Sequence, residues 1–154
     1  MGTQQILLIV LSVIIVGAAI AVGIQMFNNQ SYSANKTAIA ADAQSYASQI
    51  VQYYKTPVSQ GGAGGDVANM TAAKVGPFIG FLEGEEEGEW GAGVYGIEND
   101  NGIYTVANAS SAVDGEFTIV ITGLGKEVKG ELQPQILTTI TFPEGVITAV
   151  ASDV

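Results

Sequence analysis

The 154-residue sequence contains no cysteine, no histidine and no arginine. The absence of cysteine excludes a disulfide framework and any metal site built from thiolates. Without histidine, the chain lacks the side chain that most often serves as a general base or metal ligand near neutral pH. Without arginine, it lacks the planar donor that clamps phosphates in a bidentate way. We therefore expect no enzyme activity, no catalytic residues and no cofactor.

Positive charge is also scarce, and the charges are unevenly placed. Five lysines stand against fifteen acidic residues, which gives a net charge of −10 and an isoelectric point near 4.1. A chain of this kind repels a phosphate backbone, so we expect no binding to nucleic acid. The first charged residue is Lys36, and all acidic residues lie between Asp42 and Asp153. The N-terminal fifth is therefore apolar and uncharged, whereas the remainder is polar and acidic.

The longest apolar run covers residues 6–24, ILLIVLSVIIVGAAIAVGI, in which Ser12 is the single polar residue. At about 1.5 Å per residue, a helix over this run is roughly 28 Å long, close to the hydrocarbon thickness of a bilayer. A cleaved secretory signal typically has a basic segment before a shorter apolar core. Residues 1–5 contain no lysine. The pattern therefore favours a membrane-inserted helix over a cleaved signal and leaves an uncleaved anchor open.

The helical pattern continues beyond the apolar run as far as Lys55. Between residues 25 and 55, apolar side chains recur at helical spacing among polar ones, and no proline occurs. Pro57 ends the pattern because proline cannot continue the hydrogen-bond ladder of a helix. We predict one N-terminal helix over residues 1–55, regular from about residue 3 and roughly 80 Å long. Its apolar half, 6–24, needs burial either in lipid, as the anchor of a single-pass protein, or against copies of itself, as the core of a polymer.

The remaining residues, 56–154, predict a small β-rich head. Residues 58–75 are rich in glycine and alanine, so we expect an irregular linker there. The apolar segment 77–82 is expected to dock on the core. Alternation with a period of two predicts five strands, at 93–97, 103–107, 116–122, 136–142 and 146–151. Turn residues between the first two and the last two predict antiparallel hairpins. The predicted fold class is α+β, a long helix packed on a small antiparallel sheet.

This order of parts resembles the type IV pilin superfamily. The resemblance is carried by the opening QQILLIVLSVIIVGAAIAVGI, by the amphipathic extension that ends in YYKTP, and by the β-rich domain that follows. It covers residues 1–55 in sequence and the whole chain in architecture. It implies that subunits wait in the lipid bilayer, engage pilus assembly machinery, and bundle their apolar helices with copies of themselves in an extracellular filament. The expected function is that of a structural filament subunit; a minor pseudopilin of a secretion system and a membrane-anchored surface binding domain are the alternatives.

The sequence departs from the pilin pattern in three ways. The family usually has Phe or Met first and Glu fifth; Met1 fits, whereas Gln5 offers a neutral hydrogen bond in place of a charge-assisted one. No basic leader precedes the apolar run. The proline that kinks the apolar half of many pilin helices is also missing. Gly17 and Gly23 either weaken the helix there, by about 1 kcal/mol each, or permit close helix packing. The residues expected to act in assembly are Met1, Gln5, Val10, Val13, Ile14, Gly17, Ile20 and Gly23.

Two further sets of residues are candidates for a ligand or a modification. An acidic cluster at 83–89 offers the carboxylate oxygens that Ca²⁺ prefers, but a solvated loop, or one that meets a lysine of the next subunit, is the favoured explanation. Its candidate metal ligands are Glu85, Glu86 and Glu87. Four N-x-S/T sequons occur where roughly one is expected by chance. Their candidate glycosylation sites are Asn29, Asn35, Asn69 and Asn108, and the first two are equally able to face a neighbouring helix.

Overall fold

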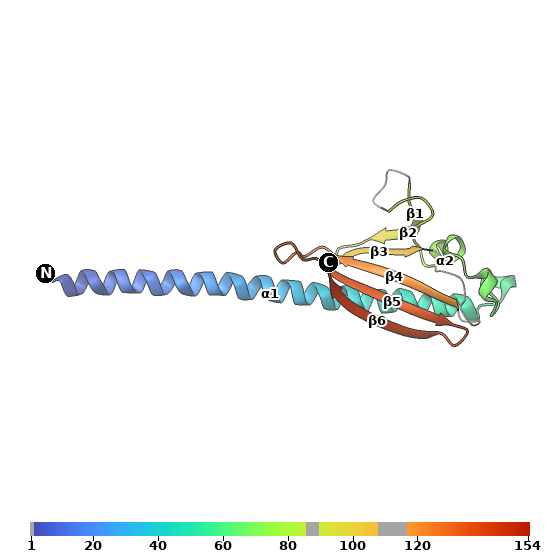
Figure 1. Ribbon diagram of the computed structural model, residues 1–154, viewed down its shortest axis with the longest axis horizontal. Helices are drawn as coiled ribbons and strands as arrows, with labels where there is room; N and C mark the ends of the chain where they lie inside the picture. Colours follow the sequence, from blue (N-terminus) through green and yellow to red (C-terminus); the bar gives the residue numbers. More distant parts are fainter. Residues whose placement is uncertain (1, 86–89, 108–116) are drawn as a thin grey trace.

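The computed structural model describes residues 2–85, 90–107 and 117–154 of the chain. A long N-terminal helix packs its second half on one face of a six-stranded antiparallel sheet, and its first half projects beyond that sheet (Figure 1). The predicted α+β class, with a long helix on an antiparallel sheet, is confirmed.

Helix α1 runs without a break from Thr3 to Lys55. It ends where predicted, because Thr56 is extended ahead of Pro57 and its backbone N–H donates to the carbonyls of Gln52 and Tyr53. The buried residues of α1 recur at spacings of three and four, which places them on one stripe of the helix. They are Ile39, Ala43, Ala47, Ile50, Tyr53 and Tyr54.

The strands lie in the sheet in the same order as in the sequence, and every neighbouring pair is antiparallel. Alternate residues are buried in the strands at 102–107, 117–125 and 134–142, as expected for a sheet with one covered face. Both predicted hairpins are present, at residues 95–107 and 134–153. The strands are β1 (Leu82–Glu83), β2 (Tyr95–Glu98), β3 (Gly102–Ala107), β4 (Phe117–Gly125), β5 (Pro134–Phe142) and β6 (Val146–Asp153).

The segment between α1 and the sheet is more regular than predicted. It contains the 3-10 turns η1 (Val58–Gln60) and η2 (Val67–Asn69), followed by the short helix α2 (Ala72–Phe78). The prediction of an irregular linker through residue 75 is therefore wrong for these parts. Burial of Ala72 and Val75 in the core overrides the weak local preference of a glycine-rich sequence.

The glycine-rich stretch also has a fixed place, at the C-terminal end of α1. The backbone N–H groups of Ala63 and Gly65 donate to two carbonyls in the last turn of the helix, those of Tyr53 and Tyr54, at 3.0 and 2.8 Å. Helix ends leave such carbonyls without partners. The stretch therefore acts as a cap for α1.

The core lies between the buried stripe of α1 and the covered face of β3, β4 and β5. Aromatic rings join the two layers: Tyr46 lies 4.9 Å from Phe81 and 5.2 Å from Tyr104, measured between ring centroids. Tyr54 contacts Phe142 in the same way at 4.8 Å. Of residues 77–82, Ile79 and Phe81 dock on the core as expected, whereas Phe78 and Leu82 keep 42% and 71% of their surface exposed.

Candidate membrane and assembly surface

The first half of α1 exposes its apolar side chains on every side. Between residues 6 and 24, which we call the apolar segment, the large apolar side chains keep from 50% of their surface exposed at Leu11 to 70% at Leu7. A helix that is apolar all round is stable only when buried in protein or in a membrane. By length and composition α1 is able to span a membrane, and an N-terminal signal sequence passes the same test. The described residues leave this surface uncovered.

Four of the predicted assembly residues have β-branched side chains, lie in this segment and are exposed. They are Val10, Val13, Ile14 and Ile20. A Cβ atom added at Gly17 or Gly23 meets nothing within 4 Å. The fold of a single chain therefore does not require glycine at either position, and α1 continues through both as a regular helix. If the two glycines permit close helix packing, as predicted, the packing is between the helices of different chains.

The remaining predicted assembly residues, Met1 and Gln5, lie at the N-terminal end. Gln5 lies in the first turn of α1, is exposed, and donates its backbone N–H to the carbonyl of Gly2 at 2.9 Å. Met1 lies outside the described residues. The expectation that these two residues act in assembly stays a prediction.

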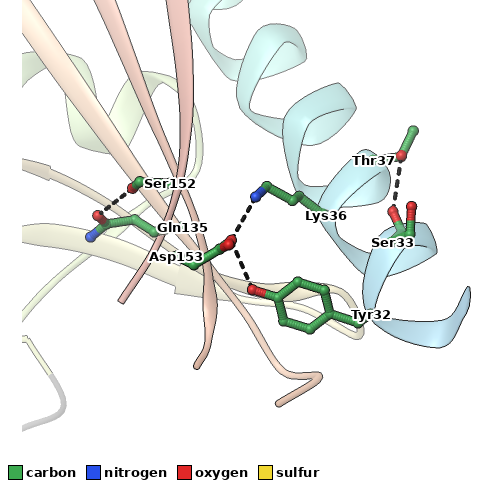
Figure 2. Close-up of polar contacts among 7 residues, drawn as sticks. All are labelled: Tyr32, Ser33, Lys36, Thr37, Gln135, Ser152 and Asp153. Carbon is green, nitrogen blue, oxygen red and sulfur yellow. Dashed lines mark hydrogen bonds and ion pairs between the residues drawn. The ribbon is translucent and has the colours of Figure 1, made fainter. Parts of the chain in front are cut away.

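A clamp at residues 32–36 fixes α1 to the end of β6 (Figure 2). The Nζ atom of Lys36 lies 2.5 Å from Oδ1 of Asp153, and the hydroxyl of Tyr32 donates to the same oxygen at 2.8 Å. The hydrogen bond from Lys36, and next that from Tyr32, hold the pKa of the Asp153 carboxyl below its usual value. Desolvation raises the pKa of Tyr32, and the hydrogen bond to Asp153 and the charge of that carboxylate raise it further. The head is thus tied to α1 near the point where the helix leaves it.

A second polar cluster fixes the β2–β3 hairpin to the middle of the amphipathic half. Oδ2 of Asp42 accepts hydrogen bonds from Nδ2 of Asn99 at 3.1 Å, Nδ2 of Asn101 at 2.8 Å and the hydroxyl of Tyr104 at 2.8 Å. Desolvation raises the pKa of the Asp42 carboxyl, but the three donors outweigh it and the net pKa is lowered. Desolvation and the bond to Asp42 raise the pKa of Tyr104.

Two of the described sequon asparagines use their side chains to hold the fold. Nδ2 of Asn35 donates to the carbonyl of Asn101 at 2.7 Å, and its Oδ1 accepts from the backbone N–H of Glu127 at 3.4 Å. Nδ2 of Asn69 donates to the carbonyl of Ala63 at 3.2 Å. A glycan attaches through this same nitrogen, so both side chains are already engaged.

The other two sequons differ from these. Asn29 is exposed on α1, just beyond the apolar segment. It is therefore the described sequon asparagine that is most open to modification. Asn108 lies outside the described residues.

The acidic cluster is only partly described. Glu85 is exposed beyond the end of β1, whereas Glu86 and Glu87 lie outside the described residues. Among residues 2–85, 90–107 and 117–154, no group of three or more acidic side chains is placed to hold a metal ion. The metal candidates gain no support from this part of the chain.

The polar cluster at Asp42 was not predicted. One signal for it is present in the sequence, because Asp42 lies three residues after Ile39 and four before Tyr46, on the apolar stripe of a predicted helix. A carboxylate in such a position needs donors from another element. The identity of those donors, Asn99, Asn101 and Tyr104, depends on how the hairpin docks.

No family model, curated protein or solved structure matches this chain. The architecture itself is that of an apolar N-terminal helix packed on an antiparallel sheet, a shape that is compatible with a pilin.

Proposed function

We propose that this protein is the structural subunit of a type IV pilus-like filament, held in a membrane before assembly and found on the cell surface afterwards. The observation that carries the proposal is the exposure of the apolar segment on every side of a helix that projects beyond the head (Figure 1). Burial of each large apolar side chain contributes about 1.5–3 kcal/mol. An environment that covers the whole circumference of the segment therefore stabilises it strongly.

Two environments provide such cover. A bilayer does so because the segment is uncharged and matches the hydrocarbon thickness in length. A bundle of copies does so because each helix then covers its neighbours, and Gly17 and Gly23 leave room for close approach. A subunit that passes from the first environment to the second keeps the same surface buried throughout.

The rigid link between helix and head supports a polymer rather than a simple anchor. α1 continues without a break from the apolar segment into the head, and contacts at Lys36, Asn35 and Asp42 fix the sheet to it. An anchor works equally well with a flexible stalk. A helical filament needs each head at a fixed position relative to its own core helix, and this link provides it.

Electron microscopy of material sheared from cells that express the chain tests the proposal. We expect fibres that contain this protein, and we expect Ile14→Asp to abolish them because a carboxylate is costly at the bilayer centre and inside a helix bundle. Ile14→Leu is the matched control, because it keeps the apolar volume and is expected to leave fibres intact.

Other outcomes point to other functions. Protein found only in detergent-extracted membranes, without fibres, identifies a single-pass surface domain. Immunogold label confined to fibre tips identifies a minor subunit of the pseudopilin kind. Normal fibres from the Ile14→Asp variant would show that the apolar segment is not the polymer core.

A further inference from the structure

We infer that the turn between β4 and β5 is a membrane contact, which seats the head on the phosphate groups of the lipid surface before assembly. This turn, residues 126–133, is called the basal turn below. The inference rests on the proposed membrane insertion of the apolar segment, and the experiment separates failure of the one from failure of the other.

The basal turn lies beside the part of α1 that follows the apolar segment. It extends from the sheet along α1 toward the N-terminus (Figure 1). Lys129 lines a shallow hollow together with Gln25, Asn28 and Asn29 of the helix. Asn29 follows Ile24, the last residue of the apolar segment, by five residues, which is within about 8 Å along the helix axis. When the apolar segment fills the hydrocarbon layer, the basal turn therefore lies at the level of the headgroups.

The basal turn is also held in this position. Lys129 and Leu132 exchange backbone hydrogen bonds at 2.9 and 3.2 Å around Gly130, which has a φ of 71°. At its base, the backbone N–H of Glu127 donates to Asn35 of α1, and Nε2 of Gln133 donates to the carbonyl of Gly125 at 2.6 Å. A contact surface that is ordered before binding loses little conformational freedom when it binds.

The chemistry of the turn suits the boundary between hydrocarbon and water. Val128 and Leu132 flank Lys129 and keep 55% and 49% of their surface exposed. The helix residues that share the hollow with Lys129 are amides, whereas Met26 and Phe27, at the same level of α1, keep 67% and 73% of their surface exposed. A lysine among exposed apolar side chains is typical of segments that lie at a membrane interface, where the apolar groups enter and the ammonium group stays in the headgroup layer.

The lysines at this end of the head differ in their partners. Lys36 is ion-paired with Asp153, and Lys126 with Glu98 at 2.7 Å. Among the described residues, Lys129 has no carboxylate within 4 Å. Its charge adds, after the hydrogen bonds from Lys36 and Tyr32 and the attraction of Lys36, to the lowering of the Asp153 pKa. Because no ion pair holds its ammonium group, the group is available to a lipid phosphate. The turn as a whole has no net charge, since Glu127 and Glu131 balance its two lysines, so the contact depends on the placing of Lys129 and its apolar neighbours.

The absence of cysteine makes a direct test possible, because a single introduced cysteine is the only labelling site. Full-length Val128→Cys, Glu144→Cys and Ile14→Cys proteins are labelled with a fluorophore. They are reconstituted into vesicles of phosphatidylethanolamine and phosphatidylglycerol that contain lipids with a nitroxide quencher in the headgroup or in the acyl chain. Glu144 is the matched control, because it is exposed between β5 and β6 at the opposite end of the sheet (Figure 1).

We expect headgroup quenchers to reduce the fluorescence of the Val128→Cys label several-fold more than that of the Glu144→Cys label. Acyl-chain quenchers should act on the Ile14→Cys label. If headgroup quenchers act equally weakly on the labels at residues 128 and 144 while acyl-chain quenchers act strongly on the label at residue 14, the basal turn does not contact the lipid surface. Membrane insertion of the apolar segment would still be supported. A label at residue 14 that acyl-chain quenchers do not reach would overturn insertion itself.

A second pair of variants tests the lysine. Lys129→Glu is expected to reduce the quenching of the Val128→Cys label, because an added carboxylate is repelled by lipid phosphate. Lys55→Glu makes the same charge change at the far end of α1 and is expected to leave the quenching unchanged. An equal effect of both variants would show that Lys129 makes no specific contact with the lipid surface.

Discussion

The hydroxyl of Tyr104 lies 2.8 Å from Oδ2 of Asp42, and this bond joins β3 to α1 across 62 positions of sequence. Tyr104 has no exposed surface, whereas Asp42 is half-buried and receives two further donors from the hairpin turn. The contact lets a carboxylate lie on the packing stripe of α1. It also defines the position of the β2–β3 hairpin relative to the helix, because the turn asparagines converge on the same oxygen.

Asp42→Ala is expected to lower the free energy of unfolding by about 1–3 kcal/mol, because the buried hydroxyl of Tyr104 then has no acceptor. Tyr104→Phe removes that hydroxyl and should cost less, about 1 kcal/mol. Urea unfolding of the full chain in detergent, followed by near-UV circular dichroism, measures both. Asp100→Ala is the control: this exposed residue of the same turn should change stability by less than about 0.5 kcal/mol. Equal effects of the two aspartate variants would contradict the role of Asp42.

The same carboxylate should make the head sensitive to acid. The pKa of Asp42 is lowered in the folded protein, so the unfolded chain binds a proton more readily than the folded one. The stabilisation by Asp42 is therefore complete above its unfolded pKa, which is about 3.9, and is lost as pH falls through the lower folded value. Between pH 7 and pH 3, the stability of Asp42→Asn should fall less than that of the unaltered protein. Parallel stability curves for the two proteins would show that Asp42 does not titrate with folding.

The features predicted from sequence are those that depend on local pattern. The bounds of α1 follow from uninterrupted periodicity and from Pro57, and the apolar segment is visible in composition alone. The two hairpins follow from turn residues between alternating strands. Each of these signals lies within a short stretch of chain, so no knowledge of the tertiary structure is needed.

The features that were missed depend on contacts between distant residues. β4 continues to Gly125 although Gly123 suggests an end near Thr122. A Cβ atom at Gly123 would lie 3.2 Å from the ring of Tyr104, so the glycine makes room for a buried aromatic ring on the neighbouring strand. The polar cluster at Asp42 and the engagement of Asn35 are of the same kind, since their partners lie 57 to 92 positions away.

The two sequons on α1 should respond differently to substitution. Asn35→Ala removes a side chain that bonds to both the β2–β3 turn and the basal turn, and should cost about 1–3 kcal/mol of stability. Asn29→Ala, at an exposed site on the same helix, should change stability by less than about 0.5 kcal/mol. Urea unfolding compares the two variants. A neutral Asn35→Ala would show that the two turns do not depend on this side chain for their position.

The buried alanines between helix and sheet give the last prediction. Ala43 and Ala47 are fully buried on the stripe of α1 that faces the sheet, whereas Ala41 is exposed on the same helix. Ala47→Leu forces extra volume into this contact and should destabilise the head by about 1–3 kcal/mol. Ala41→Leu is the matched control, because leucine and alanine differ little in helix propensity. Urea unfolding should therefore separate the two variants clearly. If they unfold together, the stripe through Ala47 is not the face on which the head is fixed, and the rigid link that a filament subunit needs would have to lie elsewhere on α1.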